Sequence, residues 1–355
     1  MRKIERLFII SAACLFFSFI AAGCNSQSSD NGTDPSTGDT AVITPSDNIA
    51  SEAADPSGID SVSSQTGTTD ASGSDASGTN TSSEKPDPIV YNVSDNQIRF
   101  TSYDLTDTYD EASVTLIQMD KMEVTITGVG ASIQDNKIVI TQEGTYIFEG
   151  NLTNGQIYVN VSDQEKVQLV LNNVDIFCNT SAPIYIANAD KTVITLPEGT
   201  VNSVSDSFAP MDDTVKGCIY SKDDLTFNGT GTLNVTGNYN NAISCKNDLT
   251  IVDGTYNLTA ANNALKGNDS ISILSCTMTI ESMDDGCKVD NDVDADKGYL
   301  FIAGGSFDIT ANDDCFQCPR AFIIQGGHVL ARCYGKTVNC DGYSIGAESY
   351  ISSGY

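Results

Sequence analysis

The sequence predicts an all-β fold of stacked coils, a single-stranded parallel β-helix with about 22 residues per coil. Three observations predict it. The chain repeats itself at roughly that spacing, each repeat carries short runs of alternating apolar residues, and no segment shows a convincing helical period. A propeller blade would need four strands, and the repeat is too short to hold them.

Residues 1–23 are expected to be a lipoprotein signal peptide. Three basic residues precede an apolar run, which ends in small residues before Cys24. The apolar run is shorter than a membrane-spanning helix requires. Cleavage would leave Cys24 as a diacylated anchor, so we expect a lipid-anchored protein on the extracellular face of the cell membrane.

Residues 24–89 are rich in Ser, Thr, Gly and Asp and predict a disordered, acidic stalk, since they cannot bury enough apolar surface to offset their chain entropy. Residues 90–355 are expected to form one folded domain. No terminal cap is evident after the last repeat, as in a fragment or an unusually short domain.

The composition limits the partners. Against 47 Asp and Glu the chain has 18 Lys and Arg, a net charge of −29. This excludes nucleic acid, because a phosphate-binding surface has to be basic, and it makes divalent cations expected companions. Nine cysteines, unevenly spaced from Cys178 to Cys340, are expected to be mostly buried small residues with one or two disulfides. We expect a monomer.

The repeat divides each coil into three short strands. The first strands begin at Leu225, Leu249, Ile271, Leu300 and Phe322. The second strands begin at Leu233, Tyr256, Met278, Phe307 and Val329. The third strands contain Ile219, Ile243, Leu265, Cys287 and Phe316. Stacking such coils about 4.8 Å apart pairs each backbone group with the coil above or below.

Four runs carry a resemblance to a known family: Gly-Thr-Tyr-Ile-Phe-Glu-Gly (144–150), Val-Gln-Leu-Val-Leu-Asn-Asn-Val-Asp-Ile (167–176), Ser-Lys-Asp-Asp-Leu-Thr-Phe-Asn-Gly (221–229) and Asp-Asp-Gly-Cys-Lys-Val-Asp-Asn-Asp (284–292). Over roughly residues 95–340 the chain resembles the carbohydrate-binding β-helix lipoproteins of anaerobic Gram-positive bacteria. The resemblance implies a right-handed, pectate-lyase-like helix that binds calcium and attaches to polygalacturonate and cellulose without cleaving them.

One corner recurs in four coils, as Asn240-Asn241, Asn262-Asn263, Asp284-Asp285 and Asp313-Asp314. Turn chemistry explains the Asn pairs, whereas stacked carboxylates repel one another and favour a shared cation. An insertion after Lys288 adds acids at alternate positions, for which a solvated acidic loop is the alternative. We predict Ca²⁺ ligands among Asp284, Asp285, Asp290, Asn291, Asp292, Asp294, Asp296, Asp313 and Asp314.

The predicted sugar-binding residues are Lys266, Lys288, Arg320 and Tyr239. Lys266 and Lys288 occupy one repeat position and should point outward, one above the other. Such a column suits the carboxylates of a uronate chain, although each lysine could instead neutralise a nearby aspartate. Arg320 adds a corner cation, and Tyr239 offers a stacking ring in a chain without Trp.

We therefore expect non-catalytic, calcium-assisted binding of an acidic polysaccharide from the plant cell wall or elsewhere, such as pectin or polygalacturonate, with cellulose as a further ligand. A lyase is the first alternative and would use calcium and a strong base such as Arg320. A hydrolase would need two carboxylates from the recurring corner. A structural adhesin or wall spacer is the remaining class, because fold alone does not decide function.

Overall fold

The computed structural model describes residues 85–93, 96–209 and 212–354. The predicted signal peptide, the Cys24 anchor and the stalk up to residue 84 lie outside the described residues. Within the described part, no helix is long and apolar enough to cross a membrane.

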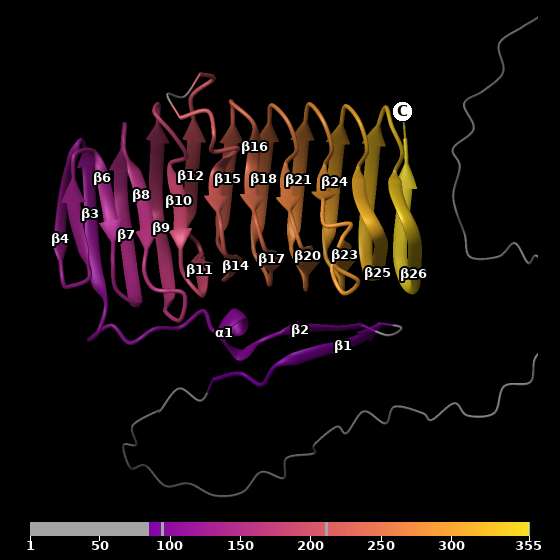
Figure 1. Ribbon diagram of the computed structural model, residues 1–355, viewed down its shortest axis with the longest axis horizontal. Coiled ribbons are helices and arrows are strands. Elements are labelled where there is room, and N and C mark those ends of the chain that lie inside the picture. Colours follow the sequence, from indigo (N-terminus) through magenta and orange to yellow (C-terminus); the bar gives the residue numbers. More distant parts are fainter. Residues whose placement is uncertain (1–84, 94–95, 210–211, 355) are drawn as a thin grey trace, which may run out of the picture. The chain divides into compact units, whose positions relative to one another are not determined.

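Three ladders of parallel strands run along the stack, and most coils give one strand to each (Figure 1). Ladder A contains β6 (Lys137–Ile140), β8 (Gln156–Asn160), β10 (Ile184–Asn188), β13 (Gly217–Ser221), β16 (Asn241–Cys245), β19 (Leu265–Gly267) and β22 (Cys287–Val289). It continues into the first parts of the long strands β25 (Phe316–Cys333) and β26 (Val338–Ser353).

Ladders B and C complete each coil. Ladder B contains β7 (Gly144–Leu152), the first part of β9 (Lys166–Cys178), β11 (Lys191–Thr195), β14 (Asp224–Asn228), β17 (Asp248–Ile251), β20 (Ser270–Ile273) and β23 (Tyr299–Ile302). Ladder C contains the end of β9, β12 (Val201–Asp206), β15 (Thr232–Gly237), β18 (Thr255–Ala260), β21 (Thr277–Ser282) and β24 (Ser306–Ala311). Later parts of β25 and β26 extend both ladders.

The strands predicted from the repeat lie in the expected register. On ladder B, Ile271 pairs with Leu249 on one side and with Leu300 on the other. On ladder A, Cys287 pairs with Phe316. The predicted coils of three short parallel strands are therefore confirmed from residue 217 onward.

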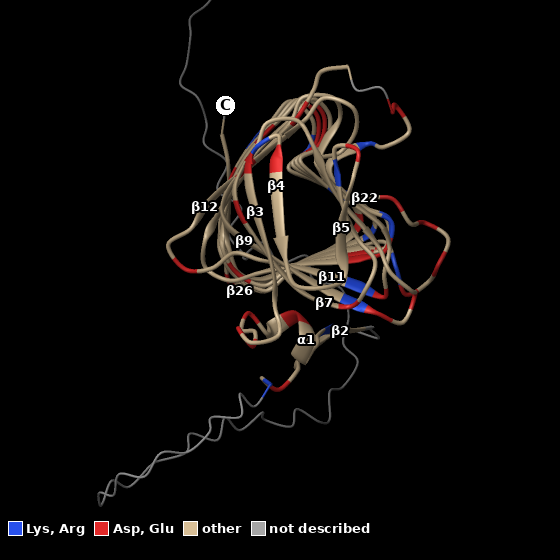
Figure 2. Cartoon of the chain, turned by 90° about the vertical axis from the view of Figure 1, so that its left-hand side faces the viewer, with Lys and Arg blue, Asp and Glu red and all other residues tan. Residues whose placement is uncertain are grey.

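The core lies inside the coils. Along β21 and β18 every second side chain is buried, which is the period of a strand with one face inward. The inward residues join into one cluster that extends from Ile117 to Ala331. Burying each large aliphatic side chain contributes about 1.5–3 kcal/mol. Viewed down the stack, the coils superimpose (Figure 2).

Antiparallel hairpins close the N-terminal end of the stack. Strand β3 (Thr115–Lys121) pairs antiparallel with β4 (Glu123–Thr127), and β5 (Ala131–Gln134) pairs antiparallel with β6. Lys121 and Asp135 adopt positive φ angles of 61° and 55° at the two turns. These hairpins were not predicted, and they make the sheet mostly parallel instead of wholly parallel.

A separate N-terminal arm packs on the outside of ladder B. It consists of β1 (Ile89–Val93), β2 (Asn96–Phe100) and the short helix α1 (Ser102–Leu105). Phe100 and Ile98 pack against Phe301 and Ile323 of ladder B. Two views place the arm beneath the coils (Figures 1 and 2). The arm therefore covers the outer side of ladder B and not that of ladder A.

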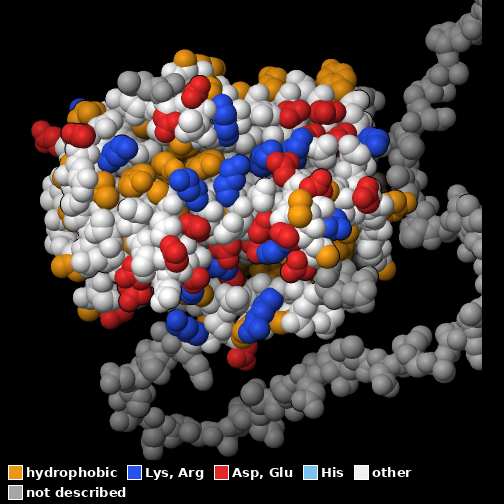
Figure 3. Space-filling view, viewed as in Figure 1, with side chains coloured by type: hydrophobic (Ala, Val, Ile, Leu, Met, Phe, Trp, Pro, Cys, Tyr) orange, Lys and Arg blue, Asp and Glu red, His pale blue; other side chains and the backbone are white. Residues whose placement is uncertain are grey.

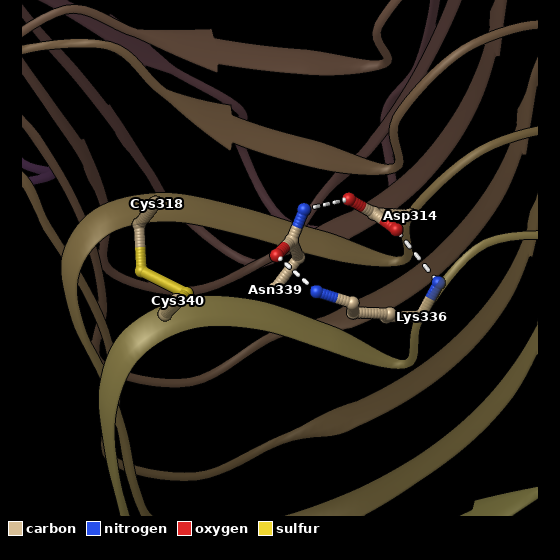
Figure 4. Close-up of a disulfide and its surroundings, with 5 residues drawn as sticks. All are labelled: Asp314, Cys318, Lys336, Asn339 and Cys340. Atoms are coloured by element: carbon tan, nitrogen blue, oxygen red, sulfur yellow. Dashed lines mark hydrogen bonds between the residues drawn. A yellow bond between two sulfur atoms is a disulfide. The ribbon is translucent and has the colours of Figure 1, made fainter.

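One disulfide joins the last two coils. Cys318 of β25 pairs with Cys340 of β26, directly opposite in the register (Figure 4). Cys315, the other half of the CxxC run, is free and buried. Of the nine cysteines from Cys178 onward, six are free and buried and Cys333 is free and half-buried, as expected for small core residues with one disulfide.

Candidate functional site

The corner between ladder C and ladder A holds the four stacked polar pairs. The second residue of each pair is buried, and these residues are Asn241, Asn263, Asp285 and Asp314. The Asn263 Oδ1 atom accepts a hydrogen bond from the Asp285 N–H at 3.2 Å, and the Asp285 Oδ1 atom accepts one from the Asp314 N–H at 3.0 Å. The predicted stacking is confirmed, and the buried members bind the backbone of the next coil.

Three carboxylates converge at this corner. Oxygen atoms of Asp284, Asp285 and Asp313 lie within 4.8 Å of one another, and the described residues contain no other such group of three acid, His or Cys side chains. Burial raises the pKa of Asp285, and the Lys288 Nζ atom at 2.9 Å opposes that rise. Three carboxylates from two successive coils are a suitable partial ligand set for Ca²⁺, which takes six to eight oxygen ligands.

Asp314 points to the last coil (Figure 4). Its Oδ1 atom accepts from the Lys336 N–H at 2.6 Å, and its Oδ2 atom accepts from the Asn339 Nδ2 atom at 2.6 Å. Both oxygen atoms are therefore bound by protein donors. The predicted role of Asp314 as a metal ligand stays a prediction and would have to compete with these hydrogen bonds.

The acidic loop after β22 does not bring three of its carboxylates together. All four of its alternating acids are exposed, and they are Asp290, Asp292, Asp294 and Asp296. Asn291 organises the loop instead. Its Oδ1 atom accepts from the Asp294 N–H at 3.0 Å, and its Nδ2 atom donates to Asp269 at 2.9 Å. Because the corner precedes β22 and this loop follows it, the predicted ligands occupy two separate places.

Arg320 supports this loop from the next coil. Its Nε atom donates to the Asp294 carbonyl at 3.0 Å, and its Nη2 atom donates to the Asp292 carbonyl at 3.1 Å. The guanidinium therefore has a structural contact that the sequence did not reveal. Its predicted role in sugar binding stays a prediction.

Lys266 and Lys288 lie opposite each other on ladder A, as the repeat predicts. The Lys266 Nζ atom is 2.8 Å from an oxygen of Asp290, and the Lys288 Nζ atom is 2.9 Å from an oxygen of Asp285. Each lysine thus neutralises a nearby aspartate, which is the alternative that the sequence left open. Both side chains remain about a quarter exposed.

The same outward column continues upstream with aromatic residues that the predicted site did not include. In chain order it runs Tyr158, Tyr185, Tyr220, Ser244, Lys266, Lys288, Gln317 and Asn339. Neighbouring tyrosine rings meet edge to face, with centroids 5.3 Å and 5.4 Å apart. The repeat contains the missed signal, because each tyrosine follows an inward isoleucine as Lys266 follows Leu265.

Three exposed lysines border this column. Lys137 lies over the Tyr158 ring and Lys222 over the Tyr185 ring, with Nζ-to-centroid distances of 5.2 Å and 5.8 Å. Lys246 follows β16 in the next coil. Among the described residues no acid lies within ion-pair distance of any of the three. Figure 3 shows basic and hydrophobic side chains in a band across the middle of one face.

Tyr239 lies on the loop that enters the corner from ladder C. The Lys216 Nζ atom donates to its hydroxyl at 2.7 Å and lies 4.7 Å from its ring centroid. The ring is half-buried. Tyr239 therefore forms a second tyrosine–lysine unit, separate from the ladder A column, and its predicted role in sugar stacking stays a prediction.

A cavity of about 890 Å³ lies between the arm and ladder B and is lined by Arg99, Tyr103, Lys166 and Lys191 among others. Two of its cations are already paired, Lys166 with Asp190 and Lys191 with Asp104. None of the predicted calcium or sugar-binding residues lines it.

Known proteins resemble this chain over its folded part. A family model described as "Carbohydrate-binding domain-containing protein" matches residues 134–353. A carbohydrate-binding domain-containing protein of Acetivibrio thermocellus is 39% identical over 227 residues, which cover 62% of this chain and 79% of that protein. The matched model includes ladder A and the acidic corner.

A solved structure is also similar. It is described as the structure of the polysaccharide lyase-like protein from C. thermocellum, gadolinium derivative. The two chains are 37% identical with a TM-score of 0.64, and the match covers 66% of this chain and 98% of that one.

Proposed function

We propose that this chain, which belongs to the family of carbohydrate-binding domain-containing proteins, binds an acidic polysaccharide. The proposed binding surface is the outer face of ladder A. Polygalacturonate or pectin is the proposed ligand class, with cellulose as a further ligand. The observation that carries the proposal is the gathering of lysines on this face, which are Lys137, Lys222, Lys246, Lys266 and Lys288. In a chain of net charge −29 such a band is suited to a carboxylated polymer.

The proposed fold class is a right-handed, single-stranded, pectate-lyase-like parallel β-helix. The parallel register of all three ladders and the polysaccharide lyase-like neighbour support it. Crossovers between parallel strands of one sheet are right-handed in about 98% of cases.

Calcium is the proposed cofactor. Asp284, Asp285 and Asp313 are the residues that would hold it, since their carboxylates converge, and Asp285 would bind it in competition with the Lys288 Nζ atom and the Asp314 N–H. The ion would neutralise the stacked acids and join two successive coils, and it would leave coordination positions open for a sugar carboxylate or water. The exposed loop acids, Asp290 to Asp296, are the second candidate location.

The proposed location is the extracellular face of the cell membrane, through Cys24. This rests on the signal-like first residues and on the stalk composition, which both lie outside the described residues. A monomer on a stalk would present ladder A to wall polysaccharide.

The proposed activity is binding without cleavage. Neither arginine of the coils offers the unbound strong base that a lyase could use, because Arg320 donates to two loop carbonyls and Arg332 pairs with Asp308. The description of the structural neighbour as lyase-like keeps cleavage as the alternative to be tested.

The test is affinity electrophoresis of the full chain in polygalacturonate and in neutral galactan, with calcium and with chelator. A parallel assay follows the ultraviolet absorbance of unsaturated product. We expect retardation by polygalacturonate only and a flat absorbance. Rising absorbance would establish a lyase, and equal retardation by both polymers would favour a non-specific adhesin.

A further inference from the structure

Two tyrosines on the first coils present partly exposed rings beside unpaired cations. Tyr158 of β8 and Tyr185 of β10 pair in register on ladder A. Lys137 and Lys222 lie over these rings, with Nζ-to-centroid distances of 5.2 Å and 5.8 Å. All four side chains are at least partly exposed. The arrangement combines apolar ring surface with two exposed ammonium groups.

The third tyrosine of the column limits the available ring surface. Tyr220 is 6% exposed because Ala182 and Val215 pack against it. It supports Tyr185 from the next coil through edge-to-face contact. A ligand on this part of ladder A would therefore meet Tyr158 and Tyr185, with Tyr220 as their buried support.

Charge distinguishes these coils from the predicted site. Lys266 and Lys288 have their charges matched by Asp290 and Asp285, whereas Lys137 and Lys222 have no acid within ion-pair distance among the described residues. A sugar carboxylate that binds Lys266 or Lys288 has to displace an aspartate. One that binds Lys137 or Lys222 displaces no acid. Direct anion binding is therefore favoured at Lys137 and Lys222.

The acidic corner is too far away to act on this place. Three strand pairings on ladder A separate the coil of β13 from the coil of β22, which is about 14 Å at 4.8 Å per coil. Charges are screened over about 8 Å at physiological ionic strength. A cation at Asp284, Asp285 and Asp313 would thus neither contact a sugar at Tyr158 nor set its affinity.

We propose that Tyr158, Tyr185, Lys137 and Lys222 form a subsite for a carboxylated sugar that binds without a metal ion. This rests on the proposed function and names the residues that give it selectivity. The rings cover the apolar face of the sugar, and the two ammonium groups donate to its carboxylate. The calcium corner and this subsite would hold separate stretches of one polymer chain.

The test is calorimetric titration of the full chain with a short oligogalacturonide in chelator, beside a neutral oligogalactoside. We expect binding of the acidic oligomer only. Lys222→Gln should weaken it about tenfold, since the change removes one charge-assisted hydrogen bond to the sugar carboxylate. Tyr158→Ala with Tyr185→Ala should remove measurable binding, and Tyr185→Phe should retain most of it because the ring remains.

Matched controls lie off this face. Lys85→Gln removes a cation that lies 5.9 Å from the Tyr103 ring on the arm, and Tyr343→Ala removes a ring that is 73% exposed in β26. Both should bind as the unchanged chain does, and all variants should keep its thermal midpoint. Two results would show that the subsite is wrong while the proposed function stands. In the first, the unchanged chain binds the acidic oligomer but chelator abolishes this binding. In the second, the chain with Tyr158→Ala and Tyr185→Ala binds as the unchanged chain does. If the unchanged chain binds no acidic oligomer or polymer in either condition, both are wrong.

Discussion

A single buried carboxyl group, Asp206 at the end of β12, makes folding stability depend on pH. The side chain is 4% exposed, and its Oδ1 atom accepts from the Asn238 and Tyr239 N–H groups. Burial raises its pKa to about 6, and these hydrogen bonds only partly oppose the rise. Because the folded form binds the proton more tightly, stability should fall as the pH rises from about 4 to about 6.

Asp206→Asn should therefore stabilise the protein at neutral pH by about 1–3 kcal/mol, since an amide keeps the Oδ1 acceptor without a buried charge. Chemical denaturation at several pH values measures this. The variant should have a smaller slope between pH 4 and pH 6, since Asp285 still contributes, while Asp213→Asn, an exposed neighbour, should keep the full slope. Equal slopes in all three proteins would show that Asp206 is not the group responsible.

The corner pairs show how a change of one residue alters a ladder's chemistry without altering its geometry. Asn263 and Asp285 both accept the backbone N–H of the next coil through Oδ1. Replacing the amide by a carboxylate adds a buried charge, which Lys288 neutralises at 2.9 Å. The first positions, half-buried Asp284 and exposed Asp313, have no such backbone role, so their charge is available for a cation.

The N-terminal arm depends on one buried ion pair. Asp104 is 1% exposed, and its Oδ1 atom accepts from the Lys191 Nζ atom at 2.8 Å and from the Thr226 hydroxyl at 2.6 Å. Burial alone would raise its pKa, but Lys191 and these hydrogen bonds lower it overall. The stabilisation that this ion pair gives to the folded state is fully present above the usual carboxyl pKa. It is lost as the pH falls through the lowered pKa of Asp104.

Asp104→Ala should release the arm while the coils stay folded. Breaking a buried pair by removing one partner destabilises by about 3–5 kcal/mol, because Lys191 is left uncompensated. Hydrogen exchange should show faster exchange in β1, β2 and α1 and no change in ladder C. Asp107→Ala, an exposed acid beyond the helix, should leave the arm protected. Faster exchange throughout the coils would mean that the arm is part of one cooperative unit.

The coil strands could be predicted from the sequence, whereas the antiparallel hairpins, the exact match of the first coils to the later ones and the arm could not. From residue 217 the coils have nearly the same length apart from the insertion after Lys288, so inward residues recur at one spacing within each coil. Upstream, the loop between β12 and β13 lengthens the coil and hides the match between Tyr185 and Tyr220. The arm gives no repeat signal, because its side chains pack on the outer surface of ladder B.

The sequence predicted where the residues of the candidate site lie in the stack better than it predicted which side chains they contact. Repeat spacing correctly placed Lys266 opposite Lys288 and stacked the corner pairs. It could not show that Asp290 neutralises Lys266, or that Arg320 binds the carbonyls of the acidic loop. Such contacts depend on where long side chains reach, and the spacing of a repeat contains no information on that.

Calcium should stabilise the whole stack if it binds at the acidic corner. Each coil of such an array contacts only its neighbours, so an ion shared by Asp285 and Asp313 would add a further link between two successive coils. At a hundred times its dissociation constant a ligand adds about 2.7 kcal/mol to stability. Thermal unfolding with and without calcium measures this.

Asp313→Asn should remove that gain, and Asp296→Asn, in the exposed loop, should keep it. The reverse pattern would place the ion in the loop. If the thermal unfolding midpoint of the unchanged chain is the same with and without calcium, a stabilising calcium site is excluded.

The arm also determines how the molecule would carry a mechanical load. It runs across the strands of ladder B from Lys191 on an early coil to Phe301 and Ile323 on late ones (Figure 1). A pull on the chain ahead of Lys85 would therefore be shared in shear by side chains on successive coils. A tether attached to one edge strand would instead peel that strand away one hydrogen bond at a time. A protein held by this end should resist the drag of a bound polymer better than one held by the end of its last coil.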